Sequence, residues 1–460
     1  MKRTILFVLT LCLCLAVFGT TLAETATTEA PKAETQATET SAEELYKAGH
    51  EAFSAEDYGK AMEYLAKAAE LGNSDALFAI GCMYDVGLGV EQDTGKAIEY
   101  YQKAAGLGNA GAMNNLGVLY EDGQGVEQDY EQALKYYQQA MELGEAFAYA
   151  SIGDMYRNGR GVEQDLLKAA EYFKKAQELG ADSDEFRQGV DELTESLRDA
   201  AREASAAEDY GTAMTYLEIA AELGNIQAWR GIGWLYQYGL GVEQDYGKAM
   251  EYYQKAAELG DVSSQHNVGF LYFSGLGVER DEVKAMEYLL PAAEAGEAAS
   301  QYLVSCGYLY GRGVEQNNEE AAKYARMSAE QGDANGQCML GYCYDQGIGV
   351  EQDDAEAMKY YLLAAEQNNM AAVFNVGVHY DKGRGVEQDY GKALEYYTLA
   401  AEKGVPVAFF AIGDFYYLGK GVEADTDKAA EYYQKALDAG YKPDEEDQEH
   451  LKAVMGEKLS

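Results

Sequence analysis

Residues 109–144 read NAGAMNNLGVLYEDGQGVEQDYEQALKYYQQAMELG, and they contain the pattern from which the fold can be predicted. Apolar residues recur at helical spacing in both halves: Ala112, Leu116, Leu119 and Tyr120, then Ala133, Leu134, Tyr137, Ala140 and Met141. Gly123 and Gly125 separate the halves, because glycine adopts left-handed backbone angles at little cost. Asp129 then stands where a helix N-cap is expected. The stretch therefore predicts two helices joined by a glycine turn.

The same pattern recurs along most of the chain. The string GVEQD begins at residues 89, 125, 161, 241, 349 and 385, and close variants begin at 277, 313 and 421. Successive starts lie 36 residues apart within each run, and one interval, from 161 to 241, is 80 residues. A period of this length indicates a solenoid, in which each repeat stacks only on its neighbours.

Two segments, 45–72 and 197–224, lack the glycine turn, and each begins a run of repeats. We therefore expect two arrays, the first with three glycine-turn repeats and the second with six. The predicted divisions are a first array over 43–180, a connecting helical segment over 181–205, a second array over 206–440 and an acidic C-terminal capping helix over 441–460.

The N-terminus has the features of an export signal. Lys2 and Arg3 precede an apolar run that is too short to span a bilayer, and a small-residue cleavage site ends at about Ala23. Residues 1–23 are therefore predicted to be a signal peptide, and the Thr-, Ala- and Glu-rich segment 24–42 a flexible spacer. We expect an exported protein, periplasmic, in the cell envelope or secreted, with no membrane insertion after cleavage.

The charge of the chain limits its partners. Asp and Glu number 79 against 36 Lys and Arg, for a formal net charge of −43. Such a field repels nucleic acid and anionic membranes, so neither is an expected partner. It favours a basic or amphipathic protein or peptide, because complementary charge steers association.

The sequence offers little for catalysis. Ser-x-x-Lys, Lys-Thr-Gly, GxSxG and HExxH are absent, and GLGVEQ lacks the third glycine and the preceding strand of a dinucleotide site. The four histidines fall in different repeats, which argues against a zinc site. We expect no enzyme activity, metal, cofactor or small-molecule substrate. In an oxidising compartment, a disulfide from Cys306 to either Cys338 or Cys343 is an alternative that the sequence leaves undecided.

The repeated motif resembles a known family. Ala-x-x-x-Leu-Gly-x-x-Tyr-x-x-Gly-x-Gly-Val-x-x-Asp, here Ala112 to Asp129, is followed by Gln132-Ala133 and Tyr136-Tyr137, where the motif has Lys-Ala and Tyr-Tyr. This resembles the Sel1-like repeat, over roughly residues 45–440. The resemblance implies an all-α fold, a right-handed α/α superhelical solenoid akin to tetratricopeptide repeats.

The resemblance also implies a function. Sel1-like proteins are protein-binding scaffolds, and in bacteria they are often exported adaptors. Some secreted members are described as β-lactamase-like, so a secreted hydrolase stays an alternative. A purely structural envelope spacer is another alternative.

Positions that vary between repeats supply the candidate binding surface. Core positions repeat because packing repeats, whereas a varied position on the first helix is free to specify a partner. If the first helices line a concave face, as in tetratricopeptide-like folds, these varied positions form a groove there. The residues predicted to line this groove are Arg230, Trp234, His266, Phe270, Tyr302, Tyr342, Phe374 and Phe410. Aromatic residues and Arg are typical interface anchors. The competing interpretation is that several of these side chains pack between helices.

Overall fold

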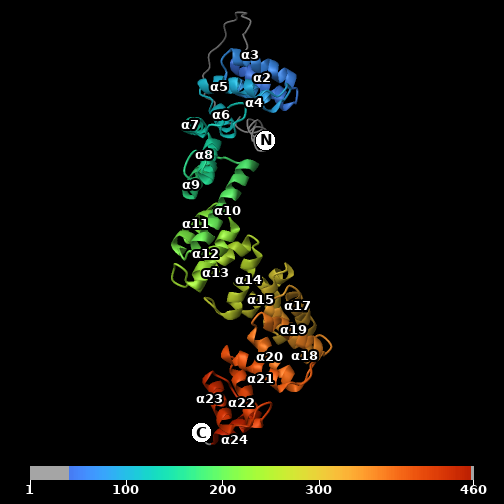
Figure 1. Cartoon of the computed structure of the whole chain (residues 1–460). Coiled ribbons are helices and arrows are strands. Elements are labelled where there is room, and N and C mark those ends of the chain that lie inside the picture. The colour runs from blue at the N-terminus through green and yellow to red at the C-terminus, as the bar shows by residue number, and fades with distance from the viewer. Residues whose placement is uncertain (1–40, 457–460) are drawn as a thin grey trace, which may run out of the picture. The chain divides into compact units, whose positions relative to one another are not determined.

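The computed structural model describes residues 41–456, and every regular element in this range is an α-helix (Figure 1). This confirms the predicted all-α solenoid. The predicted signal peptide, nearly all of the predicted spacer and the last four residues lie outside the described residues. The chain divides into two compact units, and the boundary along the chain lies between Ala228 and Trp229. We call their described parts, 41–228 and 229–456, the N-terminal unit and the C-terminal unit.

Helix hairpins build the N-terminal unit, in which each first helix packs against the second helix that follows it. The first helices are α2 (Ala42–Ser54), α4 (Ser74–Val86), α6 (Ala110–Asp122), α8 (Ala146–Asn158) and α10 (Asp184–Ala206). The second helices are α3 (Tyr58–Glu70), α5 (Thr94–Gly106), α7 (Tyr130–Glu142), α9 (Leu166–Glu178) and α11 (Tyr210–Glu222).

The C-terminal unit continues the same plan. Its first helices are α12 (Ile226–Tyr238, whose first residues precede the boundary), α14 (Val262–Ser274), α16 (Ala298–Tyr310), α18 (Ala334–Gln346), α20 (Met370–Lys382) and α22 (Pro406–Leu418). The second helices are α13 (Tyr246–Glu258), α15 (Glu282–Glu294), α17 (Asn318–Glu330), α19 (Asp354–Glu366), α21 (Tyr390–Glu402) and α23 (Thr426–Asp438). A last helix, α24 (Glu445–Met455), packs against α23. No helix of residues 41–456 is long and apolar enough to cross a membrane.

The glycine turn forms as the sequence predicts. Gly123 ends α6 in the left-handed conformation, with φ 68°, and its N–H donates to the carbonyl of Leu119. Asp129 is the N-cap of α7, because its carboxylate accepts a hydrogen bond from the backbone N–H of Gln132 at 3.0 Å. The turn thus satisfies backbone groups at the end of one helix and at the start of the next.

The glutamine of GVEQD also has a structural role. In the 109–144 repeat, Gln128 Nε2 donates to the carbonyl of Glu121, 2.8 Å away, near the C-terminal end of α6. The same bond to the carbonyl seven residues earlier is made by Gln92, Gln164, Gln244, Gln316, Gln352 and Gln388. It satisfies one of the carbonyls that a helix leaves without an intrahelical partner.

A glycine on the first helix lets an aromatic ring of the second helix lie against its backbone. A Cβ added at Gly117 would be 2.4 Å from Cε1 of Tyr137, a ring that is fully buried. The same contact joins Gly81 to Tyr101, Gly153 to Phe173, Gly233 to Tyr253, Gly341 to Tyr361, Gly377 to Tyr397 and Gly413 to Tyr433.

One hairpin replaces both partners of this contact. Ser305 stands at the glycine position of α16, and Ala325 stands at the ring position of α17. The Ser305 hydroxyl donates to the carbonyl of Ala321 at 2.8 Å, so the small Ala325 leaves room for a side chain on the first helix. The two positions therefore change together because they share one space.

Several buried tyrosine hydroxyls find polar partners on the first helix. Tyr137 donates to Glu121 at 2.8 Å, and Tyr253 donates to Gln237 at 2.7 Å. Burial raises the pKa of Glu121. In the hairpin of α14 and α15, where Leu289 replaces the tyrosine, the position that corresponds to Glu121 is Phe273. This hairpin thus has an apolar pair in place of the polar pair, as expected when a buried polar group requires a hydrogen-bond partner.

The period breaks at α10. This helix has 23 residues, whereas every other first helix has 13. It packs against α8 and α9 as well as α11. The predicted connecting segment, 181–205, is therefore largely this helix, while the compact units meet later in the chain, within α12. The sequence-based division into arrays at 181–205 stays a prediction.

The glycine–ring contact yields a stability prediction. Replacing Gly117 with Ala should cost about 1–3 kcal/mol of unfolding free energy, because the methyl group overlaps the Tyr137 ring. The double variant Gly117→Ser/Tyr137→Ala, which copies the Ser305/Ala325 pair, should lose less than the sum of its single variants. Urea unfolding together with hydrogen exchange of α6 and α7 measures these differences.

The control is Gly106→Ala at the last position of α5, where an added Cβ meets nothing within 4 Å. This variant should be neutral or slightly stabilising. Strict additivity of the Gly117 and Tyr137 substitutions would show that the two positions do not share space.

Candidate functional site

The predicted groove residues differ widely in exposure. Trp234 on α12 and Tyr342 on α18 are exposed, at 43% and 36%. Arg230, His266, Phe270, Tyr302 and Phe374 are half-buried. Phe410 is only 3% exposed and packs against Tyr433 and Tyr441, with ring centroids 4.7 and 5.0 Å away. Phe410 therefore belongs to the core beside α24 and does not lie at the surface.

Three of the half-buried residues have structural partners within the C-terminal unit. Arg230 forms an ion pair with Asp261 at 2.8 Å, and Asp261 is the N-cap of α14. His266 Nδ1 lies 2.9 Å from Ser300 Oγ, and burial lowers the pKa of its imidazole. Phe374 lies against Tyr397, with a centroid distance of 5.3 Å. For these three residues, contacts between helices account for the position of the side chain, and no ligand is needed to explain it.

Tyr302 and Tyr342 border one cavity, whose lining residues come from α16, α18 and α20. Its volume is about 210 Å³. The lining residues are Tyr302, Tyr310, Asn335, Cys338, Met339, Tyr342, Asn369, Ala371 and Asn375. Tyr310 is 55% exposed, so aromatic surface continues from the cavity to the outside.

The sequence analysis missed most of this lining. Asn335, Cys338, Met339 and Tyr342 are spaced i, i+3, i+4 and i+7, which places them on one face of α18. The varied first-helix positions compared between repeats were 338 and 342 on this helix, and the predicted groove included Tyr342 alone. Helical periodicity applied to the whole of α18 would have found the other two.

The chemistry of this cavity suits binding. None of its lining residues carries a formal charge at neutral pH, and burial raises the pKa of the Cys338 thiol to about 12. The Asn369 side chain caps α20 and also donates to Asn335 Oδ1 at 2.9 Å. The cavity therefore offers tyrosine rings and amide groups, which is the mixture of apolar walls and a few polar groups found in ligand sites.

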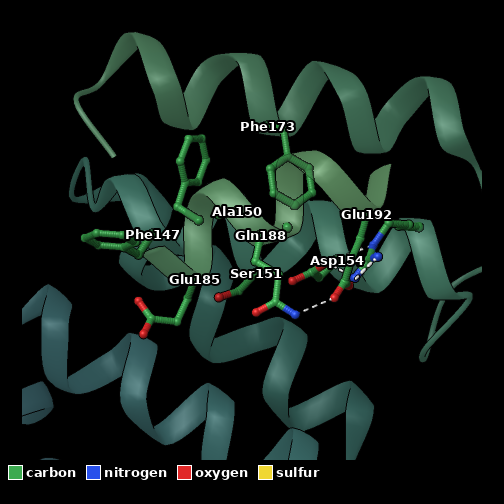
Figure 2. Close-up of a pocket in the computed structure, with 11 residues that line it drawn as sticks. Phe147, Ala150, Ser151, Asp154, Phe173, Glu185, Gln188 and Glu192 are labelled. Carbon is green, nitrogen blue, oxygen red and sulfur yellow. Dashed lines mark hydrogen bonds and ion pairs between the residues drawn. The ribbon is translucent and has the colours of Figure 1, made fainter. Parts of the chain in front are cut away.

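A second pocket lies in the N-terminal unit, between α8 and α10. Its volume is about 100 Å³, and its lining is Phe147, Ala150, Ser151, Asp154, Arg157, Phe173, Glu185, Phe186, Gln188, Gly189 and Glu192. Figure 2 shows Phe147 and Glu185 at one end, Asp154 and Glu192 at the other, and Ser151 and Gln188 between them. No residue of this pocket was predicted from the sequence.

An ion-pair cluster closes one end of this pocket. The guanidinium of Arg157 lies 2.7 Å from Asp154 and 2.7 Å from Glu192, and its side chain is 8% exposed. Gln188 Nε2 donates to Glu192 at 2.7 Å. The Arg157 charge is thus fully engaged by carboxylates of α8 and α10.

Metal-ligating and thiol groups are dispersed. Within residues 41–456, no group of three or more His, Cys, Asp or Glu side chains is placed to hold a metal ion. Cys82, Cys306, Cys338 and Cys343 are all free thiols. Burial raises the pKa of Cys343 to about 12 as well, so the thiolate forms of Cys338 and Cys343 are scarce at neutral pH.

The raised thiol pKa values yield a prediction on reactivity. Because each pKa is raised to about 12, the thiolate fraction at pH 8 falls, and iodoacetamide should modify native Cys338 and Cys343 roughly 1,000-fold more slowly than an ordinary thiol. Mass spectrometry of native and urea-unfolded protein measures the two rates. Equal rates in both states would contradict the burial of these thiols.

A family model described as Sel1 repeat matches residues 42–73, 74–109, 110–145, 146–180, 205–225, 228–261, 262–297, 298–333, 334–369, 371–405 and 406–441. No curated protein matches the chain.

Two solved structures are similar to this chain. The structure of c5321, a protective antigen of uropathogenic Escherichia coli strains displaying an SLR fold, is 29% identical, with a TM-score of 0.61 over 90% of this chain and 91% of that one. A Sel1 repeat protein from Oxalobacter formigenes is 32% identical, with a TM-score of 0.49 over 54% of this chain and 99% of that one. Because the Sel1 repeat model matches nearly all of the described helices, this chain belongs to the Sel1 repeat family.

Proposed function

We propose that this chain is an exported, non-catalytic scaffold that binds a protein or peptide segment on the first-helix faces of the C-terminal unit. Sel1 and tetratricopeptide-like solenoids are commonly protein-interaction scaffolds, which supports the general role. The observation that carries the specific proposal is the cavity between α16, α18 and α20, with exposed Tyr310 and Tyr342 beside it. Rigid aromatic side chains of this kind are typical interface anchors.

The proposed partner segment is amphipathic, with a basic face. The cavity itself is uncharged and aromatic, so it suits an apolar side chain. The chain around it has a formal net charge of −43, which attracts basic residues. The glutamate of every glycine turn is exposed and adds to this field: Glu91, Glu127, Glu163, Glu243, Glu279, Glu315, Glu351, Glu387 and Glu423. Charge then guides association and the tyrosines hold the segment.

Two observations support export. The first 23 residues have a basic start, an apolar run and a small-residue cleavage site. The Escherichia coli protein to which the chain is similar is described as a protective antigen. We propose that the mature chain begins after about Ala23 and acts in the periplasm, in the envelope or outside the cell.

The binding proposal predicts the effect of removing two exposed aromatics. Residues 24–460 serve as bait against envelope extracts and growth medium, and captured proteins are quantified by mass spectrometry. Trp234→Ala/Tyr342→Ala should lower capture of a specific partner at least about ten-fold, because anchor residues contribute well over 1 kcal/mol each. High salt should slow the association.

The matched control is Leu363→Ala/Leu399→Ala, which removes exposed apolar side chains from the second helices α19 and α21. This variant should capture as the native chain does. Equal capture by the aromatic variant and the control would place the binding surface elsewhere and favour the structural-spacer alternative.

The export proposal predicts a new N-terminus. The protein isolated from its native cells should lack residues 1–23 and begin at or near Glu24, as measured by intact mass and N-terminal peptide mapping. A chain that keeps Met1 and fractionates with the cytoplasm would contradict export.

A further inference from the structure

The cavity between α16, α18 and α20 offers amide groups in place of charges. Three asparagines, Asn335, Asn369 and Asn375, line it beside the tyrosines. The side-chain amide of asparagine carries the same donor and acceptor groups as a peptide bond, so the two can pair with each other. An ionic ligand group would find no opposite charge among the lining residues. The cavity therefore suits a neutral main chain as well as an apolar side chain.

Hydrogen bonds within the chain determine which of these amide atoms a ligand can use. Asn369 is engaged at both ends, because Oδ1 accepts from the N–H of Ala372 at 3.0 Å and Nδ2 donates to Asn335 Oδ1 at 2.9 Å. The second of these bonds occupies Asn335 Oδ1 and leaves Asn335 Nδ2 as a donor. Asn335 is exposed, so a ligand can reach this donor.

Asn375 keeps both its donor and its acceptor. Its side chain is half-buried and has no hydrogen-bond partner within residues 41–456. Packing does not require an amide here, because the equivalent positions of other first helices hold Ala79, Leu303 and Ala411. A ligand that enters the cavity displaces water from this amide, so it has to supply the hydrogen bonds that the water made.

A main chain can supply these bonds only if it is not helical. In an α-helix the N–H and C=O groups bond to one another within the helix, whereas an isolated extended segment leaves them free. Successive side chains of an extended segment point to opposite faces. A segment with an apolar side chain in the cavity thus directs the neighbouring side chains away from it, into the field of a chain with a formal net charge of −43.

We infer that the cavity binds its partner as an extended segment, with a main-chain N–H donating to Asn375 Oδ1 and a main-chain carbonyl accepting from Asn335 Nδ2. An apolar side chain lies beside Tyr302 and Tyr342, and basic side chains occupy the alternate positions. The inference rests on the proposed binding function and deepens it. It specifies that apolar and basic residues of the partner alternate one by one, and that they do not follow the period of a helix.

The experiment measures binding to residues 24–460 by ligand-observed saturation-transfer NMR. The first probe is acetyl-Lys-Leu-Lys-amide, and the second has an ester in place of the first Lys–Leu amide. The ester oxygen replaces one N–H and leaves the side chains and the charge unchanged. The variant is Asn375→Ala. The matched control is Asn267→Ala, because Asn267 is the equivalent, half-buried residue of α14 and lies outside the cavity lining.

The native chain should bind the amide probe about five-fold more tightly than the ester, as expected for one hydrogen bond between neutral groups. Asn375→Ala should abolish this difference, because it removes the acceptor of the N–H, whereas Asn267→Ala should keep it. Asn335→Ala should weaken the binding of both probes. Circular dichroism checks that each variant is folded.

Three results would overturn the inference. Equal binding of the two probes to the native chain would show that the main chain is not recognised. A difference between amide and ester that persists in Asn375→Ala would place the contact elsewhere. Tighter binding of methyl glucoside than of the peptide would assign the cavity to a carbohydrate.

Failure of the proposed function would give a different pattern. The amide probe would then not bind, and Trp234→Ala/Tyr342→Ala would capture proteins as the native chain does. If this inference alone were wrong, that double variant would still lose its partner, while the amide and ester probes would bind the native chain equally.

Discussion

The structure depends on one contact between helices, the close packing of an aromatic ring on a helix backbone at a glycine. At Gly117 the missing side chain lets the Tyr137 ring lie directly on α6. This contact determines how closely the two helices of a hairpin approach each other. The glycine turn then joins helices that are already close, and its Gln and Asp side chains satisfy the helix ends. One hairpin shows that the contact is a matter of shared volume, because Ser305 and Ala325 exchange the large and small partners.

Because this packing recurs, positions that repeat and positions that differ have separate roles. Most residues of the turn motif have a local structural function, in the backbone conformation, in hydrogen bonding or in capping. The two pockets, by contrast, are lined largely by residues that other repeats do not share. Tyr342 of the cavity corresponds to Val118 and Val378 in other hairpins, and Glu185 belongs to α10, a helix longer than any other within residues 41–456. The candidate sites of this family member therefore lie where the chain departs from its own repeat.

Much of the fold follows from the sequence, because period, helical spacing and capping residues are local signals. Asp129 was predicted as an N-cap on these grounds and is one. The role of Gln128 was not foreseen, since its bond to the Glu121 carbonyl exists only once the turn has folded back. Phe410 was predicted to lie in the groove because the variation of its position between repeats does not reveal that Tyr433 and Tyr441 cover it.

The candidate sites were harder to predict from the sequence for a related reason. Arg230 is a residue type that is typical of interface anchors, yet its side chain pairs with Asp261 of the next hairpin. The pocket at α10 depends on how a long, polar helix packs against α8, and no periodic signal describes an interruption of the period. Asn335 and Met339 could have been predicted from the sequence, because they share a helical face with Tyr342.

Site-specific photo-crosslinking tests the central claim most directly, that departures from the repeat carry binding while repeated positions carry structure. A benzoylphenylalanine is placed either at Tyr342, in the cavity, or at Glu351, the exposed turn glutamate of the same hairpin. Both chains are expressed in the native cells and irradiated, and adducts are identified by mass spectrometry. We expect one defined adduct from position 342 and none from 351. A defined adduct from 351 alone would contradict it, because the repeated acidic turns would then be the binding surface.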